Sequence, residues 1–231
     1  MIRTFKAHME LLPPAQQRLW PALRPASALG LVLYGGTAIA LRLGHRSSVD
    51  FDFFTDRPLD KDALREAFPF LTEATVLQER PNTLTVLVSG GDENDSHLKV
   101  SFFGGISHGR VGVPESTEDG VLLVASLPDL LATKVKVILQ RIETKDYQDI
   151  AAMLRAGSSL AYGLAAARVL YGGGFQPSES LKALVFFEGG DLHTLAEADR
   201  ITLLSAASVI RDLPRVGRLA PRLAIADAAL D

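Results

Sequence analysis

The sequence predicts an α+β fold, in which a mixed, largely antiparallel sheet flanked by helices is followed by a helical C-terminal lobe. Apolar and polar residues alternate over residues 47–54, as in a strand that buries one face. From Pro128 onward, apolar residues recur at helical spacing instead. Because the pattern changes near residue 125, we expect two domains, an α+β lobe over residues 1–125 and a helical lobe over residues 126–231.

The first lobe is expected to begin with a helical lead-in over residues 1–28, which prolines interrupt. An apolar run then stops at Gly35-Gly36 and resumes as a short helix that ends at Gly44. Further along, the patterns predict a helix over residues 59–69, strands over 83–88, 97–103 and 121–125, and a polar turn over 89–95. These strands make up the predicted sheet together with the strand over 47–54.

The second lobe is expected to consist of helices separated by Gly and Pro. The first helical pattern starts at Pro128 and carries apolar residues to Leu154. Ala- and Leu-rich segments then predict helices over residues 159–171, 178–187, 194–210 and 217–229.

Composition excludes several classes of protein and of site. The 231 residues include no cysteine, which excludes disulfides, thiolate metal sites and a cysteine nucleophile. No apolar run approaches the roughly 20 residues that span a bilayer, and the N-terminus lacks the apolar stretch of a signal peptide. We therefore expect a cytoplasmic protein without a membrane partner. With a net charge of −3, any nucleic acid would have to bind at a local basic patch.

Two acidic residues on the predicted strand over 47–54 indicate a metal site. Asp50 and Asp52 are two residues apart, so both carboxylates point to one face of the strand, while Phe51, Phe53 and Val49 point to the other. Oxygen ligands of this kind suit Mg²⁺ or Mn²⁺, which keep waters and substrate phosphates in their remaining positions. We expect the two carboxylates to be accessible on a central strand and the three apolar residues to be buried.

A glycine turn upstream of these acids indicates a place for phosphate. The backbone amides of Gly35 and Gly36 precede a helix, where they are free to take phosphate oxygens. A glycine turn, a short helix and an Asp-x-Asp strand lie within about twenty residues, which is the arrangement that holds a triphosphate against its metal. Arg46 and Ser48 lie just before the acidic strand, close enough to help bind phosphate.

Residues 34–54, with Gly35-Gly36-Thr37 at one end and Asp50-Phe51-Asp52 at the other, closely resemble the signature of the AbiEii/AbiGii-type nucleotidyltransferases. That family is part of the DNA-polymerase-β-like superfamily and is associated with type IV toxin–antitoxin and phage-defence systems. A second block, with Lys134, Arg141 and residues 145–150, looks like the helical motif of the family. The similarity covers most of residues 31–155.

The resemblance implies a nucleotidyltransferase fold and an enzyme that moves a nucleoside monophosphate from a nucleoside triphosphate (NTP) to an acceptor hydroxyl, such as that of RNA or a tRNA 3′ end. It also implies a cognate antitoxin as a partner. In this reading the catalytic residues are Asp50, Asp52, Lys134 and Asp146, of which Asp50 and Asp52 hold the metal, and the nucleotide-binding residues are Gly35, Gly36, Thr37, Arg46, Ser48 and Arg141.

The second block adds four expectations. Lys134 and Arg141 are seven residues apart and would share one helix face, and Lys145 would form an i,i+4 ion pair with Asp149. We expect Lys134 to be exposed, so that its removal leaves the fold intact. Lys134 and Asp146 are expected to lie within one nucleotide's reach of Asp50.

One position departs from the pattern of the superfamily. Ser101 stands where a later strand usually carries a third carboxylate, and a serine hydroxyl cannot act as a base or as a charged ligand. Either Asp146 supplies the missing acid, or metal alone activates the nucleophile, or transfer activity has been lost. The alternatives are therefore an inactive nucleotide- or partner-binding protein, or an antibiotic nucleotidyltransferase with an acidic acceptor pocket at Asp92, Glu93 and Asp95.

Overall fold

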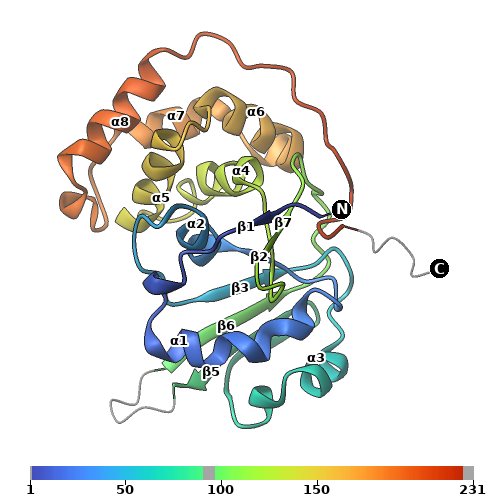
Figure 1. Cartoon of the computed structure of the whole chain (residues 1–231). Coiled ribbons are helices and arrows are strands. Elements are labelled where there is room, and N and C mark those ends of the chain that lie inside the picture. Colours follow the sequence, from blue (N-terminus) through green and yellow to red (C-terminus); the bar gives the residue numbers. More distant parts are fainter. Residues whose placement is uncertain (1, 91–96, 226–231) are drawn as a thin grey trace. The chain divides into compact units, whose positions relative to one another are not determined.

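The computed structural model describes residues 2–90 and 97–225 (Figure 1). The chain divides into two compact units. Unit 1 comprises Met1–Gly109, Val113–Ala125 and Ala220–Asp231, and unit 2 comprises Arg110–Gly112 and Ser126–Leu219. The division into lobes over residues 1–125 and 126–231 stays a prediction, and each unit is described by itself.

Unit 1 is built on an eight-stranded mixed sheet with the order β1-β7-β8-β2-β3-β6-β5-β4. Its strands are β1 (Thr4–Phe5), β2 (Val32–Tyr34), β3 (Phe51–Phe54), β4 (Thr75–Arg80), β5 (Thr83–Ser89), β6 (His97–Phe103), β7 (Glu115–Thr117) and β8 (Leu123–Val124). The pairs β2–β3, β4–β5, β5–β6 and β7–β8 are antiparallel, whereas β1–β7, β2–β8 and β3–β6 are parallel. The predicted α+β class with a mixed, largely antiparallel sheet is confirmed.

Aromatic side chains fill the core on one face of the sheet. Phe51 and Phe53 on β3 are fully buried, and the ring of Phe53 stacks on that of Phe102 on β6 at 5.5 Å. Trp20 lies 6.3 Å from Phe51, and Phe68 lies 5.5 Å from Phe102. Such pairs stabilise a core beyond their buried area. The alternation in the sequence thus fixes which face of β3 is buried.

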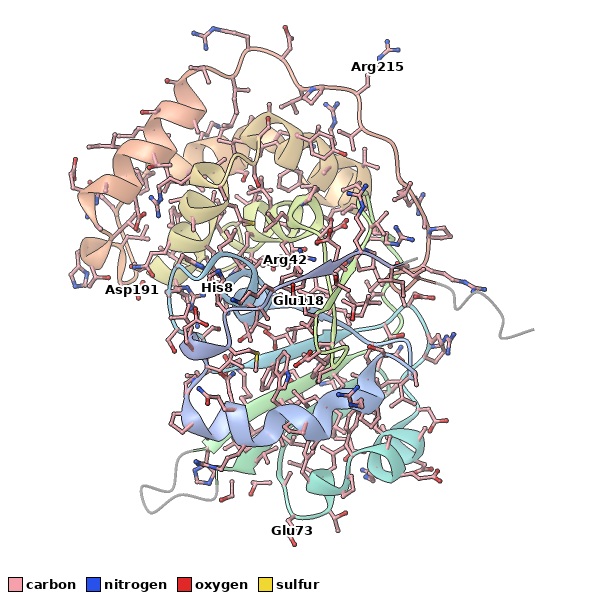
Figure 2. All side chains as sticks on the ribbon, viewed as in Figure 1. His8, Arg42, Glu73, Glu118, Asp191 and Arg215 are labelled. Atoms are coloured by element: carbon pink, nitrogen blue, oxygen red, sulfur yellow. The ribbon has the colours of Figure 1, made fainter. Side chains whose placement is uncertain are left out.

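The helices of unit 1 are α1 (Pro14–Leu19), α2 (Gly35–Leu43) and α3 (Lys61–Ala67), with the 3₁₀ helices η1 (Met9–Leu11), η2 (Trp20–Ala26) and η3 (Pro69–Thr72). Arg42, labelled in Figure 2, holds α2 against the sheet. Its guanidinium donates to the carbonyl oxygens of Ala125 and Val124 at 2.9 and 3.0 Å and pairs with Glu115 at 2.5 Å. As predicted, α2 ends at Gly44, which adopts a left-handed conformation with φ of 65°.

Unit 2 is helical over the residues that the structure describes. Its α-helices are α4 (Leu127–Val137), α5 (Thr144–Arg155), α6 (Leu160–Tyr171), α7 (Pro177–Val185) and α8 (Glu197–Ser208), with the short η4 (Gly172–Gly174) and η5 (Leu192–Thr194). A Cβ atom on Gly163 of α6 would lie 2.5 Å from the Leu131 side chain on α4. A glycine at this position therefore allows α4 and α6 to pack closely. None of the helices in the described ranges is long and apolar enough to cross a membrane.

Four details differ from the sequence-based expectations. The lead-in over residues 1–28 contains a short strand, β1, as well as helices. Strands β4 and β7 were not predicted. Every residue of β4 is exposed, so this edge strand lacks the apolar alternation that reveals a half-buried strand. Val49 is 52% exposed, so the expectation that it is buried is wrong.

The helix expected over residues 217–229 is also wrong over residues 217–225, which form no helix. Pro221 lies within this range and removes a backbone donor that a helix would need. The main-chain NH of Leu223 instead donates to Asp56 Oδ1 at 3.0 Å, and the Leu223 side chain is 1% exposed. Residues 226–229, and most of the polar turn expected over 89–95 with Asp92, Glu93 and Asp95, lie outside the described residues.

Candidate active site

The Gly35-Gly36 turn brings a carboxylate and a guanidinium against the start of α2. Helix α2 begins at Gly35, whose φ is +76°. A Cβ atom on Gly35 would lie 2.6 Å from Asp52 Oδ2, and one on Gly36 would lie 2.5 Å from Arg46 Nη2 and 3.1 Å from Ser48 Oγ. At Gly35 the positive φ and the nearby carboxylate both favour glycine, and at Gly36 a Cβ atom would displace the end of the Arg46 side chain. The two glycines bring together Asp52, Arg46 and Ser48 at a helix N-terminus.

Asp50 and Asp52 lie on the same face of the sheet at its centre. β3 begins at Phe51, so Asp50 directly precedes the strand and Asp52 is its second residue. Asp52 is aligned with Ser101 on β6, and Asp50 contacts Lys99, two residues earlier on β6. Because residues two apart on a strand share a face, both carboxylates lie on the face opposite the phenylalanine core. Both residues are partly exposed, as a metal site requires.

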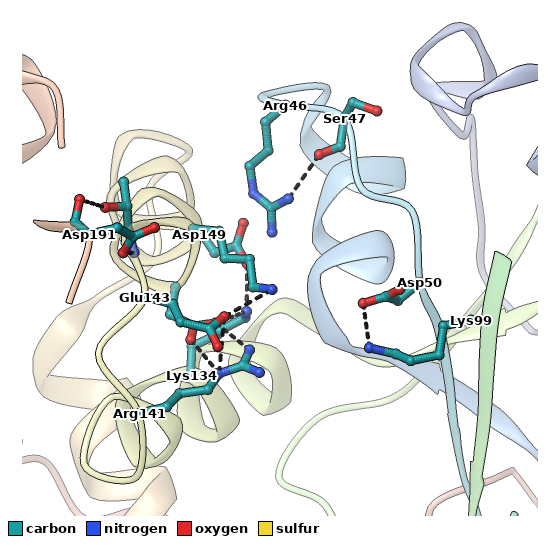
Figure 3. A network of polar contacts seen from close by, with 12 residues as sticks. Arg46, Ser47, Asp50, Lys99, Lys134, Arg141, Glu143, Asp149 and Asp191 are labelled. Atoms are coloured by element: carbon teal, nitrogen blue, oxygen red, sulfur yellow. Dashed lines mark hydrogen bonds and ion pairs between the residues drawn. The ribbon is translucent and has the colours of Figure 1, made fainter. Parts of the chain in front are cut away.

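Thr37 and Ser48 connect the loop before β3 to α2. The Thr37 hydroxyl lies 2.9 Å from Ser48 Oγ and also donates to the main-chain carbonyl of Asp50. The Thr37 side chain is buried, so its hydroxyl fixes the backbone at Asp50. Arg46 donates from Nη1 to the Ser47 carbonyl at 2.9 Å (Figure 3).

The sequence-based interpretation missed Lys99. Its Nζ atom lies 2.8 Å from Asp50 Oδ2, and the side chains are 40% and 27% exposed. The signal was present in the sequence, since Lys99-x-Ser101 repeats the spacing of Asp50-x-Asp52 on a strand that had been predicted. Ser101 itself is 2% exposed beside Asp52, where a third carboxylate had been expected.

In unit 2, Lys134 forms the centre of a buried ion-pair network (Figure 3). Its Nζ atom lies 2.5 Å from Asp146 Oδ1 and 2.6 Å from Asp149 Oδ2. Arg141 binds Asp146 with two nitrogens, Nε to Oδ2 at 2.8 Å and Nη2 to Oδ1 at 3.1 Å. Both carboxylates are fully buried, and Lys134 is 5% exposed. Arg141 is the accessible member of the four, with a side chain that is 46% exposed.

Three expectations about this block are wrong. Arg141 does not share a helix with Lys134, because α4 ends at Val137 and Arg141 lies in the connection to α5. Lys145 pairs with Glu143 at 2.9 Å, whereas Asp149 pairs with Lys134. Lys134 is buried, not exposed, because its ammonium neutralises two buried carboxylates that helix spacing alone could not reveal.

The environment of Asp146 keeps it ionised. Burial by itself would raise the pKa of the Asp146 carboxyl, but the hydrogen bonds from Arg141 and the charge of Lys134 outweigh it and hold the pKa below its ordinary value. A carboxylate with a lowered pKa is a weak proton acceptor. The N-terminus of α5 is held separately by Asp191, whose Oδ1 accepts from the Thr144 main-chain NH at 2.6 Å.

The candidate metal ligands are therefore the two acids of unit 1. Within residues 2–90 and 97–225, no group of three or more His, Asp or Glu side chains is arranged to hold a metal ion. A pair of carboxylates is enough for Mg²⁺, because this ion usually binds one or two protein carboxylates and keeps water and phosphate as its other ligands. The expectation that Lys134 and Asp146 lie within one nucleotide's reach of Asp50 stays a prediction.

Comparison with protein families matches residues 18–211 to the family described as "Nucleotidyl transferase AbiEii toxin, Type IV TA system". A curated relative, an uncharacterized protein from Aquifex aeolicus (strain VF5), is 32% identical over 140 residues, which cover 58% of this chain and 64% of that protein. The match thus spans less than two thirds of the relative's length.

Two solved structures resemble the fold. The first is a crystal structure of an H. pylori protein assigned as a nucleotidyltransferase, with a TM-score of 0.58 and 15% identity, covering 84% of this chain and 92% of that one. The second is an antigenic nucleotidyltransferase-like protein from Paracoccidioides brasiliensis, with a TM-score of 0.54 and 14% identity, covering 90% of this chain and 96% of that one. At these identities the likeness concerns the fold.

Proposed function

Because the chain belongs to the AbiEii family of nucleotidyltransferase toxins, we propose that it transfers a nucleoside monophosphate from an NTP to an acceptor hydroxyl and releases pyrophosphate. The observation that carries this proposal is the position of Asp50 and Asp52 beside the Gly35-Gly36 turn. Asp52 Oδ2 lies against Gly35 at the N-terminus of α2, which can bind phosphate, and Asp50 shares its face of the sheet.

The residues of unit 1 fit a divalent cation. Asp50 and Asp52 offer carboxylate oxygens on one accessible face, which suits Mg²⁺ or Mn²⁺. The space that a Cβ atom on Gly35 would fill lies directly against Asp52 Oδ2. When bound, the metal would neutralise charge on the phosphates. The amides of Gly35 and Gly36, together with Arg46 and Ser48, would hold the phosphate chain, and Thr37 would fix the backbone at Asp50.

For unit 2, we propose that Arg141 contacts phosphate and that Lys134 and Asp146 hold it in place. Arg141 is the exposed member of the network, and its two hydrogen bonds to Asp146 fix the plane of the guanidinium. Lys134 and Asp146 are too deeply buried to contact substrate in this arrangement. They are therefore proposed as positioning residues of the site.

Proton transfer receives little help from the side chains proposed above as candidate acids and bases. Ser101 cannot act as a base, and Asp146 is enclosed with a lowered pKa. Catalysis would therefore rest mainly on positioning and on charge neutralisation. A catalytically inactive nucleotide- or partner-binding protein is the second candidate, because Ser101 occupies the place beside Asp52 where a third carboxylate would lie.

The acceptor and the biological role follow from the family alone. We propose that the acceptor is RNA, with a tRNA 3′ end as the first to test, and that the protein acts as the toxin of a toxin–antitoxin or phage-defence pair in the cytoplasm. A cognate antitoxin is then the expected partner. An antibiotic acceptor is the competing proposal, although Asp92, Glu93 and Asp95, which suggested it, lie outside the described residues.

A transfer assay with a panel of acceptors separates these proposals. We expect purified protein with Mg²⁺ and each of the four α-labelled NTPs to place label on RNA when total tRNA is supplied. No label should appear on aminoglycosides or in reactions without an acceptor. Label on an aminoglycoside would favour the antibiotic enzyme. Nucleotide binding without label on any acceptor would favour the inactive protein.

A further inference from the structure

Lys99 places a positive charge directly on one of the two proposed metal ligands. Its Nζ atom lies 2.8 Å from Asp50 Oδ2, as seen in Figure 3. Parallel pairing of β3 with β6 accounts for this contact. Asp52 is aligned with Ser101, and Asp50 and Lys99 each lie two residues earlier on the same face of the sheet. The register, continued by one residue before β3, therefore brings Lys99 beside Asp50.

Two cations lie close to the proposed site. Lys99 pairs directly with Asp50, and the Arg46 guanidinium lies beside Gly36, next to the glycine whose Cβ position Asp52 contacts. A divalent cation that binds Asp50 must either share the Asp50 carboxylate with the Lys99 ammonium or displace the ammonium from it. A triphosphate, in contrast, brings negative charge that both cations attract.

Lys99 has the freedom to change partners. Its side chain is 40% exposed, and a lysine ammonium sits on a flexible stem with three donors that rotate freely. One contact to Asp50 uses one of these donors, which leaves two for an anion. A rigid or fully enclosed cation would not be able to leave Asp50 when a metal arrives.

We propose that Lys99 is a positioning residue that exchanges partners during substrate binding: it pairs with Asp50 in the free protein and moves to a phosphate of the nucleotide once metal binds Asp50. This inference rests on the proposed nucleotidyltransferase function. Lys99 thereby opposes binding of metal alone and favours binding of metal together with nucleotide. Because such coupling is reciprocal, nucleotide raises the affinity for metal through the same residue.

The alternative is an ordinary surface ion pair between Lys99 and Asp50. Exposed pairs of this kind contribute about 0–1 kcal/mol to stability and have no role in ligand binding. The two interpretations differ in one measurable respect. A surface pair predicts no change with nucleotide, whereas partner exchange predicts that removing the Lys99 charge has opposite effects on metal alone and on metal with nucleotide.

The test measures binding of Mn²⁺ alone to the full chain by the electron paramagnetic resonance signal of free Mn²⁺. It measures binding of the Mn²⁺ complex of an NTP analogue, which carries a methylene bridge between its α- and β-phosphorus atoms, by equilibrium dialysis of the labelled analogue with Mn²⁺ in excess. For Lys99→Met, we expect Mn²⁺ alone to bind about fivefold tighter and the Mn²⁺–analogue complex to bind about fivefold weaker than in the wild type. Lys99→Arg, which keeps the charge, should bind Mn²⁺ alone and the Mn²⁺–analogue complex with affinities close to those of the wild type. Lys61→Met is the matched control, because the Lys61–Glu79 pair of 3.2 Å is also in unit 1 but involves neither acid of the site.

The outcomes separate this inference from the proposed function. Partner exchange would be overturned if Lys99→Met changed both affinities, for Mn²⁺ alone and for the Mn²⁺–analogue complex, in the same direction, or if it changed neither. The metal site would remain in place in both cases. A wild-type chain that binds no Mn²⁺, or Asp50→Asn with Asp52→Asn that binds it unchanged, would overturn the metal site and partner exchange together. Lys99→Met is expected to fold, because the lysine is half exposed and makes its contact through the ammonium.

Discussion

Replacing Lys134 with alanine is expected to lower the free energy of unfolding by about 3–5 kcal/mol. The Lys134 ammonium is the cation between Asp146 and Asp149, at 2.5 and 2.6 Å, and both carboxylates are fully buried. Without it, Asp146 keeps Arg141, but Asp149 loses an ion pair that neutralises it inside the helical unit. Denaturation by urea, followed by far-ultraviolet circular dichroism, measures the change.

Lys145→Ala is the matched control for this prediction. Lys145 is 46% exposed and pairs with Glu143 at the start of the same helix, α5, that carries Asp146 and Asp149. Its loss should cost less than about 1 kcal/mol. Adding Asp149→Asn to Lys134→Ala should recover part of the loss, since it removes one of the two buried carboxylate charges that the Lys134 ammonium neutralises. Equal, small effects of Lys134→Ala and Lys145→Ala would contradict the buried network.

The second large effect is expected at Gly35. Alanine there would place its Cβ atom 2.6 Å from Asp52 Oδ2 and would hold a side chain at φ of +76°. The carboxylate must move away from the turn, so we expect metal-dependent nucleotide binding to weaken by at least about tenfold, the factor that corresponds to 1.4 kcal/mol. Backbone strain should lower stability by a further, separate amount of about 1–2 kcal/mol. Isothermal titration with nucleotide and Mg²⁺ measures the first effect.

Gly30→Ala separates the strain from the loss of the site. Gly30 has nearly the same backbone conformation, with φ of +71°, but the nearest atoms to its Cβ position belong to the Arg57 side chain, at 3.6 Å or more. The two substitutions should therefore destabilise unit 1 similarly, while Gly30→Ala leaves nucleotide binding unchanged. If both variants bound nucleotide as the wild type does, the Gly35 turn would have no part in the site.

The features predicted best from the sequence are those that depend on local pattern. Alternation predicted the buried face of β3 at Phe51 and Phe53, and the glycines predicted the start and end of α2. Ser101 was expected on the later strand where the superfamily carries a third carboxylate, and pairing of β3 with β6 places it beside Asp52. The first two features are set by residues close in sequence or by a repeat of two, whereas the place of Ser101 was expected from the resemblance to the superfamily.

Val49 and β4 show where pattern fails. Val49 continues the alternation of β3, but the strand begins two residues later and leaves it exposed. β4 pairs with β5 at the edge of the sheet, so its stability comes from backbone hydrogen bonds to a neighbour and not from apolar residues on one face. Neither outcome can be read from one segment alone.

In the candidate site, too, residues in local motifs were predicted, whereas residues that depend on neighbouring elements were not. Asp50, Asp52, Gly35 and Gly36 were found because each belongs to a short motif. Lys99 was missed because its importance depends on which strand lies beside β3. The burial of Lys134 could not be predicted, since helical spacing does not tell whether a lysine faces water or two carboxylates on another helix.

Thermal unfolding of the wild type and of Asp50→Asn with Asp52→Asn, each with and without Mg²⁺ and NTP, tests whether the two aspartates bind the metal. A ligand that binds only the folded state stabilises it by mass action, so the wild-type melting temperature should rise with the metal and nucleotide together. The double variant should fold and show no such rise. Asp62→Asn, which removes an exposed carboxylate of the same unit, should behave as the wild type does. An undiminished rise in the double variant would place metal and nucleotide elsewhere and would contradict the site at Asp50 and Asp52.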